Sequence, residues 1–325
     1  MPASEHANPR LLDDLRSTLH EALDALGADD TRSKRAPPQR EIPPDLFREC
    51  IELCDRPGRV TVEPVRMIHH AACTGGTLIV KCLAAMPNVL VLNEIDPFSP
   101  LGFDPGNPNF RPSDLLALLR EGDNYVDEAL LEKLFLESFR VLHHETSMEG
   151  RRLVLRDHSH SHFFTGEQVR ARPTFRTFLA STYRTVSVVT VRDPVDSYLS
   201  LVESRWLHFT PATFDEYCRR YHAFLDAYAD EPLVRYEDFV ADPAAVARGI
   251  CDELELEFAT TFTDTFDSFR FSGDSGRRGA VIEARPRKVM NDAFVEEVRA
   301  SEAYVSLARR LGYECIGDAR GTRHP

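Results

Sequence analysis

Apolar residues recur in short clusters along the chain, and their spacing predicts alternating strands and helices. Runs rich in Val, Leu and Ile without polar alternation predict strands buried on both faces, at residues 64–69, 89–93, 152–157, 185–191 and 232–235. Segments with helical periodicity lie at residues 77–86, 113–120, 125–144, 195–206, 213–229, 243–254 and 291–312. Strands that alternate with helices predict a three-layer α/β fold with a central, mostly parallel sheet.

The N-terminal residues depart from this pattern and are predicted to form a helical extension. Leucines at helical spacing predict an amphipathic helix over residues 9–27. A polar, proline-rich linker follows it and ends near residue 43. The α/β domain is therefore expected to span residues 44–325.

Composition and charge exclude several classes of function. Hydrophobic residues make up 42% and charged residues 28% of the 325 positions, which is typical of a globular protein. The formal net charge of −13 argues against a nucleic-acid or anionic-membrane partner, because both need a basic surface. No apolar run is long enough to cross a membrane, and the N-terminus lacks a secretory pattern, so a cytoplasmic location is expected. Nothing in the sequence indicates an oligomeric state.

The loop after the first predicted strand is a candidate binding site, because parallel α/β sheets bind ligands beyond the carboxyl ends of their strands. This loop and the start of the next helix read Cys73, Thr74, Gly75, Gly76, Thr77 and Leu78. Glycines let backbone N–H groups approach a ligand, and a helix N-terminus adds partial positive charge. The segment predicts an anion cradle; a tight turn without a ligand is the alternative.

A second candidate site follows the fourth predicted strand. Arg192 ends that strand, and Ser200 lies two turns into the helix that begins near Pro194. An arginine and a hydroxyl group at these positions could hold a phosphate. The alternative is a surface ion pair of Arg192 with Asp193 or Asp196.

These two segments resemble motifs of the sulfotransferases that use 3′-phosphoadenosine 5′-phosphosulfate (PAPS). Residues 192–200 resemble the 3′-phosphate motif R-x-P-x-x-x-x-x-S of this family. Residues 74–78 resemble the loop that holds the 5′-phosphosulfate. The resemblance implies a P-loop NTPase-like sulfotransferase fold with PAPS as co-substrate and no metal.

Two further segments extend the resemblance in the family's order, so that it covers about residues 66–290. Tyr236 begins a Tyr-Glu-Asp segment, whose tyrosine lies near the adenine in the family. Arg277, Arg278 and Gly279 resemble the loop that closes over the 3′-phosphate. The resemblance therefore implies that these residues bind the nucleotide.

The third predicted strand ends in Arg156, Asp157 and His158. The corresponding strand of cytosolic sulfotransferases ends in Lys-Thr-His, which implies that Arg156 contacts the sulfonate and that His158 is the base. An imidazole titrates near neutral pH and suits this role. Because side chains alternate along a strand, Arg156 and His158 are expected to share a face, with Asp157 pointing away and not required. Glu94, after the second strand, is the second candidate for the base; capping of the following turn is its alternative role.

Two other functions stay open beside sulfonate transfer. The family usually has Lys or Arg where this sequence has Cys73, which allows a nucleotide-binding protein of the same fold without catalytic activity. His158, His160 and His162 form H-x-H-x-H, which in an extended segment would place three rings on one side, suit zinc and indicate a metal-dependent hydrolase. The favoured function is transfer of a sulfonate from PAPS to a hydroxyl group, with an amine as second choice, of a small-molecule or carbohydrate-like acceptor.

Overall fold

The computed structural model describes residues 63–101, 115–121, 127–271, 281–284 and 286–316. The predicted N-terminal helix and the boundary near residue 44 lie outside these residues. Arg277, Arg278 and Gly279 also lie outside them.

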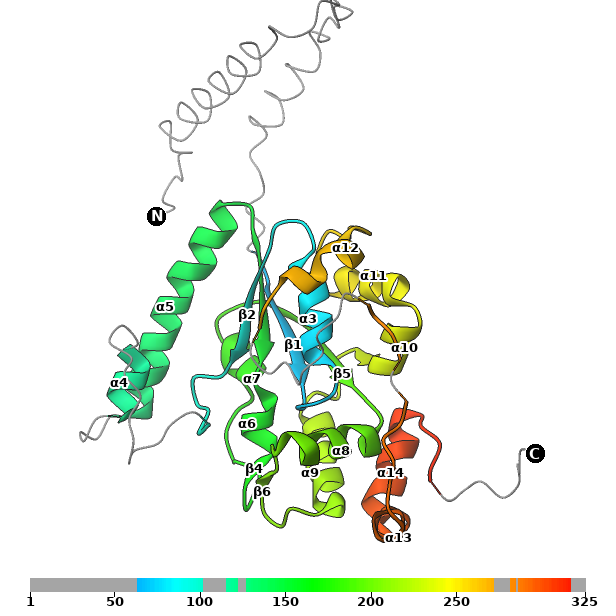
Figure 1. Cartoon of the computed structure of the whole chain (residues 1–325). Coiled ribbons are helices and arrows are strands. Elements are labelled where there is room, and N and C mark those ends of the chain that lie inside the picture. The colour runs from blue at the N-terminus through cyan, green and yellow to red at the C-terminus, as the bar shows by residue number, and fades with distance from the viewer. Residues whose placement is uncertain (1–62, 102–114, 122–126, 272–280, 285, 317–325) are drawn as a thin grey trace, which may run out of the picture. The chain divides into compact units, whose positions relative to one another are not determined.

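A parallel sheet of five strands, in the order β2-β3-β1-β5-β7, forms the centre of the described part of the chain (Figure 1). Its strands are β1 (Val65–His70), β2 (Val89–Ile95), β3 (Arg152–Asp157), β5 (Thr185–Val191) and β7 (Leu233–Arg235). Each coincides with a predicted run to within one or two residues at either end. The chain leaves β1 for the edge strand β2, returns beside β1 as β3, and crosses to β5 on its other side. The ends of β1, β3 and β5 therefore meet where such sheets bind ligands.

Helices surround this sheet; those of seven or more residues lie in predicted segments, whereas the shorter ones were not predicted. They are α3 (Gly76–Ala84), α4 (Leu115–Glu121), α5 (Glu128–Met148), α6 (Ser159–Phe163), α7 (Phe175–Ala180), α8 (Pro194–Ser204), α9 (Phe214–Ala227), α10 (Tyr236–Ala241), α11 (Pro243–Glu253), α12 (Phe262–Thr265), η1 (Phe266–Ser268), α13 (Asp292–Ala300) and α14 (Glu302–Leu311). The single helix predicted over residues 291–312 is wrong. Ser301 has extended backbone and caps α14 through its hydroxyl group, which divides the segment into two helices. Among the described residues, no helix combines the length and the apolar character needed to cross a bilayer.

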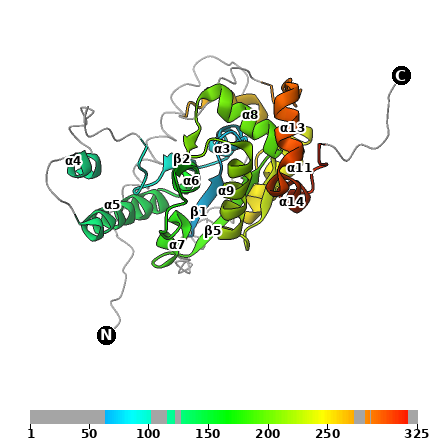
Figure 2. The same ribbon diagram turned by 90° about the horizontal axis from the view of Figure 1, so that it is seen from below.

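Alternate residues of β1 pack into two apolar layers, one on each face of the sheet. Val65 and Met67 pack against aromatic residues of α5 and α7. Ile68 points the other way, into a layer formed with α3, α11 and α12. Figure 2 shows α5 and α7 on one side of the strands and α3 on the other. The predicted three-layer α/β architecture is confirmed.

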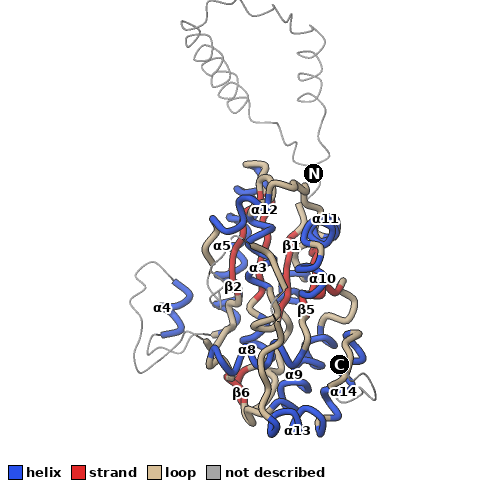
Figure 3. The backbone as a smooth tube through the Cα atoms, turned by 45° about the vertical axis from the view of Figure 1, so that its right-hand side comes forward, coloured by secondary structure: helices blue, strands red, loops and turns tan. Residues whose placement is uncertain are grey.

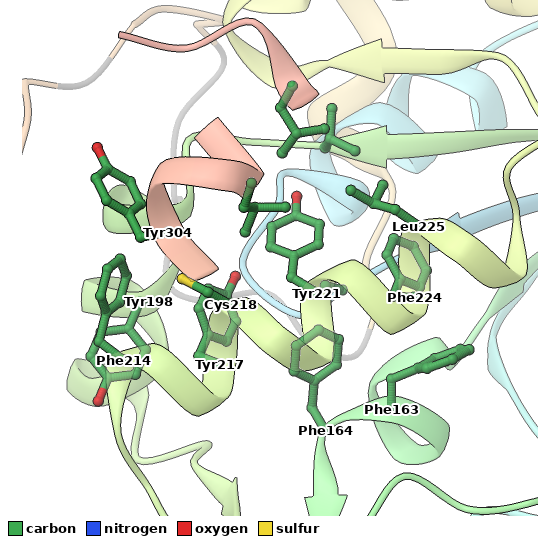
Figure 4. Close-up of a cluster of buried hydrophobic side chains, with 14 of the residues drawn as sticks. Phe163, Phe164, Tyr198, Phe214, Tyr217, Cys218, Tyr221, Phe224, Leu225 and Tyr304 are labelled. Carbon is green, nitrogen blue, oxygen red and sulfur yellow. The ribbon is translucent and has the colours of Figure 1, made fainter. Parts of the chain in front are cut away.

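The helices at the carboxyl end of the sheet share a large aromatic cluster. Tyr217, Tyr221 and Phe224 of α9 face Phe163 and Phe164, which join α6 to the short strand β4 (Thr165–Gly166) (Figure 4). The cluster continues into α8 and α14, which gather at the same end of the molecule as α9 (Figure 3). β4 pairs there with a second short strand, β6 (His208–Phe209). The segments that follow β3 and β5 are therefore held on a common apolar base.

Arg220 of α9 holds the segment that follows α6. Its side chain is 1% exposed. It donates to four backbone carbonyl groups between Phe163 and Glu167 at 2.9 to 3.1 Å, and its Nε lies 2.7 Å from the Glu216 carboxylate. One side chain thus satisfies carbonyl groups from the end of α6 to the residue after β4.

Replacing Arg220 with Met is expected to lower the free energy of unfolding by at least about 3 kcal/mol, because each buried acceptor left unsatisfied costs about 1–3 kcal/mol. Urea denaturation measures the loss. Arg219→Met is the matched control on the same helix: this side chain is 69% exposed and pairs with Asp215, so a change within about 0.5 kcal/mol is expected. Equal losses in the two variants would contradict the proposed role of the buried hydrogen bonds.

Candidate functional site

The loop between β1 and α3 is tightly turned. Cys73 and Gly75 have φ values of 65° and 87°, in the left-handed region. The Thr74 hydroxyl group donates to the Ala71 carbonyl at 2.8 Å and closes the turn. Gly75 is the N-cap of α3, and no side chain caps this helix. Such a helix start presents backbone donors and partial positive charge to a ligand.

Both glycines of the loop are required by close packing. A Cβ atom on Gly75 would lie 2.2 Å from Cδ2 of Tyr236, the first residue of α10. A Cβ atom on Gly76 would lie 2.8 Å from Cγ of the buried His70. The end of β7 therefore comes into direct contact with the loop that follows β1.

Arg192, at the end of β5, turns toward the same loop. Its Nη1 donates to the Cys73 carbonyl at 3.2 Å, and its guanidinium carbon lies 4.8 Å from the centroid of the Tyr236 ring. The alternative pairing of Arg192 does not occur among the described residues. Arg287 instead pairs with both neighbouring acids, with Asp193 at 2.5 Å and with Asp196 at 3.1 Å.

The other described residues predicted to bind the nucleotide are Ser200, Leu78 and Thr77. The Ser200 hydroxyl group, on α8, donates to the Asp196 carbonyl at 2.8 Å. Leu78 belongs to the buried layer around α3, so only its backbone can face a ligand. Thr77 lies in the first turn of α3, next to the loop.

Glu237 links the ends of β5 and β7, a role that the sequence did not predict. Its carboxylate accepts from the backbone N–H of Asp193 at 3.1 Å and from the Tyr313 hydroxyl group at 2.6 Å. Asp193 in turn caps α8 through the N–H groups of Val195 and Asp196. The Asp-Pro pair at the start of α8 is a sequence signal for this cap, whereas no local signal marks Glu237 as its partner.

Arg156 and Glu94 lie side by side at the ends of β3 and β2. The Arg156 side chain is 3% exposed, and its Nη1 donates to Asn93 at 2.8 Å and lies 3.5 Å from a Glu94 oxygen. Glu94 lies within β2, where the register with β3 shifts between Leu92 and Ile95, and its φ is 54°. This bulge lets the carboxylate reach Arg156.

His158 follows β3 as the N-cap of α6 and is not part of the strand. The expectation that Arg156 and His158 share a strand face is therefore wrong, because β3 ends at Asp157. Burial lowers the pKa of His158, and the carboxylates of Glu94, Asp96 and Asp157 partly oppose this effect. The ring is thus neutral at neutral pH, as a base must be.

The three histidines of H-x-H-x-H do not form the extended segment on which the zinc interpretation depended. His160 and His162 lie within helix α6, so H-x-H-x-H is not extended. The His160 Nε2 bonds to His208 Nδ1 at 3.3 Å, and the His162 Nε2 donates to the Arg170 carbonyl at 3.0 Å. In the part of the chain that the structure describes, no three His, Cys, Asp or Glu residues form a group that could hold a metal ion.

The sequence from residue 68 to residue 260 matches the model of a family described as "Sulfotransferase family". The chain belongs to the sulfotransferase family. The matched range contains the loop at 73–78, Arg156, His158, Arg192 and Tyr236, whereas Arg277, Arg278 and Gly279 lie beyond it.

Solved structures similar to this chain include two sulfotransferase domains. The domain from the Synechococcus PCC 7002 olefin synthase is 19% identical over 78% of this chain and 95% of its own, with a TM-score of 0.46. The domain from the curacin biosynthetic pathway is 16% identical over 78% and 99%, with a TM-score of 0.44. A sulfotransferase from Alicyclobacillus acidocaldarius is 17% identical over 78% and 97%, with a TM-score of 0.41. No curated protein matches the sequence significantly.

Buried His160 makes the stability of this protein depend on pH. Burial, with the nearby imidazoles of His158 and His208, lowers the pKa of His160 to about 3. In the unfolded chain the pKa is about 6.5, so between these values only the unfolded state binds the proton. The free energy of unfolding should therefore fall as the pH decreases below about 6.5, by up to about 1.4 kcal/mol per pH unit.

His160→Phe is expected to reduce the slope of the free energy of unfolding against pH by the contribution of one proton, because the titrating group is gone. The aromatic contact with Phe164 is kept. Urea unfolding at a series of pH values between 4 and 7 measures the slope. The same substitution at His144, which is exposed on α5, is the control. Equal flattening by both variants would show that His160 is not the source.

Proposed function

We propose that this protein transfers a sulfonate group from PAPS to a hydroxyl group of a small-molecule or carbohydrate-like acceptor. The observation that carries the proposal is the convergence of Arg192 and Tyr236 on the loop after β1. Arg156 and His158, at the end of β3, lie at the same edge of the sheet. Membership of the sulfotransferase family supports the reaction class.

The residues present fit a nucleotide that carries phosphate groups at the 3′ and 5′ positions of its ribose. The Nε of Arg192 is buried and has no hydrogen-bond partner among the described residues, as expected for a cation that awaits an anion. The turned loop and the first turn of α3 would hold the 5′-phosphosulfate through backbone N–H groups. Arg192 and Ser200 would hold the 3′-phosphate, with Tyr236 beside the adenine.

The chemical step forms a bond between the acceptor oxygen and sulfur and breaks the bond between sulfur and the bridging phosphate oxygen. His158 takes the proton of the acceptor hydroxyl group, and adenosine 3′,5′-bisphosphate leaves. Negative charge lies on the peripheral oxygens of the sulfuryl group, so a fixed cation stabilises the transition state. Arg156 has this role, by analogy with phosphoryl transfer.

The contacts of Glu94 favour His158 as the base. A Glu94 oxygen lies 3.5 Å from the Arg156 guanidinium group, so this carboxylate serves as partner of the cation. His158 forms no ion pair in the described part of the chain, and burial keeps its ring neutral. Glu94 then orients Arg156 and also stabilises the imidazolium ion that forms on His158.

Cys73 supports one alternative, a nucleotide-binding protein without transferase activity. Burial raises the pKa of the Cys73 thiol to about 11, so this position contributes no charge to the loop at neutral pH. Calorimetry with adenosine 3′,5′-bisphosphate and transfer of labelled sulfonate to pools of hydroxyl acceptors separate the two functions. Binding without transfer to any pool would favour the alternative.

Arg192→Ala is expected to weaken binding of adenosine 3′,5′-bisphosphate roughly 10- to 150-fold, because one charge-assisted contact contributes about 1.5–3 kcal/mol. Isothermal titration calorimetry measures the change. Arg219→Ala, which removes an exposed arginine of α9, is the control and should bind as the wild type does. Unchanged affinity in Arg192→Ala would remove Arg192 from the nucleotide site.

His158→Ala is expected to lower turnover by on the order of 10²–10⁴, the range of a lost general base, while nucleotide affinity stays near normal. Glu94→Gln should reduce turnover much less, because the amide oxygen can still accept from Arg156. Steady-state assays at saturating donor compare the two variants. If Glu94→Gln abolishes turnover and His158→Ala does not, the base is Glu94.

A further inference from the structure

One buried carboxylate, Asp157, stands in the chain between the two residues proposed for catalysis, Arg156 and His158. Its side chain is 3% exposed. Because successive side chains of a strand alternate between faces, Asp157 points to the face of the sheet opposite Arg156. There it packs beside β1, α6 and the end of α9.

A single oxygen of Asp157 accepts three hydrogen bonds, each from a different element. Oδ2 lies 2.8 Å from His69 Nδ1 on β1, 2.8 Å from Ser159 Oγ on α6, and 2.9 Å from the Tyr228 hydroxyl group at the end of α9. The His69 and Tyr228 rings are stacked, with their centroids 4.1 Å apart. The carboxylate therefore connects the end of β3 to three neighbours in an apolar environment.

The network keeps Asp157 charged. Burial by itself would raise the pKa of this carboxyl group, but the hydrogen bonds from His69, Ser159 and Tyr228 hold it below its usual value. Burial raises the pKa of Tyr228 well above its usual value, so this side chain stays protonated and donates. A charged group with three donors is expensive to displace.

We propose that Asp157 is a positioning residue for sulfonate transfer, which fixes the end of β3 so that Arg156 and His158 meet the substrate in one arrangement. This inference rests on the proposed function. Arg156 precedes Asp157 in β3 and His158 follows it as the N-cap of α6, so a shift of the backbone at Asp157 moves both neighbours. A misplacement of about 1 Å is enough to slow a reaction roughly 100-fold.

The charge of Asp157 also acts on His158 directly. It is one of three carboxylates that oppose the effect of burial on this imidazole, beside Glu94 of β2 and Asp96 of the segment that follows. Arg156 of β3 lowers the pKa of His158. His158 in turn lowers the pKa of three other imidazoles, which belong to His70 of β1, His160 of α6 and His208 of β6. Removal of one carboxylate therefore leaves the imidazolium form of His158 less stable.

Asp157→Asn tests both effects, because it keeps the shape of the side chain and removes the charge. The pKa of His158 is expected to fall, because one of the three carboxylates that oppose the effect of burial loses its charge. The acid limb of the kcat profile should move to lower pH by the same amount. At the plateau, kcat should fall about 10- to 100-fold with unchanged donor affinity. Histidine NMR gives the pKa, with the His158 signal identified by its absence in His158→Ala.

Tyr228→Phe separates position from charge and decides the question if Asp157→Asn does not fold. It removes one of the three donors and keeps the carboxylate. We expect a several-fold lower kcat, unchanged donor affinity and a His158 titration like that of the wild type. Tyr304→Phe is the matched control, because Tyr304 is a buried tyrosine of the same aromatic cluster that hydrogen-bonds to the Ile316 backbone instead. Its kcat should equal that of the wild type.

Two results would overturn the positioning role while the wild type transfers sulfonate. One is a Tyr228→Phe variant that loses as much stability as Tyr304→Phe and keeps full kcat. The other is an Asp157→Asn variant whose His158 titration and kcat match those of the wild type. A wild type that transfers sulfonate to no acceptor refutes the proposed function itself, and the NMR titration then still reports whether Asp157 and His158 are coupled.

Discussion

The contact between the Tyr236 ring and Gly75 is the constraint on which the arrangement of the site depends. No side chain larger than hydrogen fits at Gly75, because a Cβ atom would lie 2.2 Å from the ring. The contact brings the end of β7 against the loop after β1, across the position of β5 in the sheet. Arg192, at the end of β5, then packs over the same ring and reaches the Cys73 carbonyl. Three strand ends thus meet around one backbone turn.

This strongly acidic chain can still bind an anion at Arg192, because the neighbouring carboxylates form ion pairs with another arginine. The net charge is −13, yet the carboxylates closest to Arg192 in the sequence, Asp193 and Asp196, are paired with Arg287. Asp193 also caps α8, which uses its charge at a helix N-terminus. Arg192 therefore keeps its charge for a ligand. Long-range net charge does not prevent this, because salt screens it over about 10 Å.

Two side chains at the end of β3, those of Arg156 and Asp157, point to opposite faces of the sheet and have different partners. Arg156 points toward β2, where Asn93 and Glu94 hold it. Asp157 points to the other face and binds His69, Ser159 and Tyr228. Reactive groups gain precision when rigid neighbours hold them, and alternation along a strand provides the two faces for this purpose.

Local patterns in the chain were enough to predict the strands, the longer helices and the order of the motifs, because hydrophobic periodicity and turn residues act over a few positions. They also indicated the glycine loop, Arg192 and Tyr236. Three features became visible only in the folded chain: Arg287 pairs with the acids beside Arg192, a bulge turns Glu94 toward Arg156, and His160 and His162 lie in a helix. The folded chain also provides Asp157 with three donors, two of them more than 70 residues away in sequence. Such partners come together only when the sheet and helices pack, so no local pattern records them.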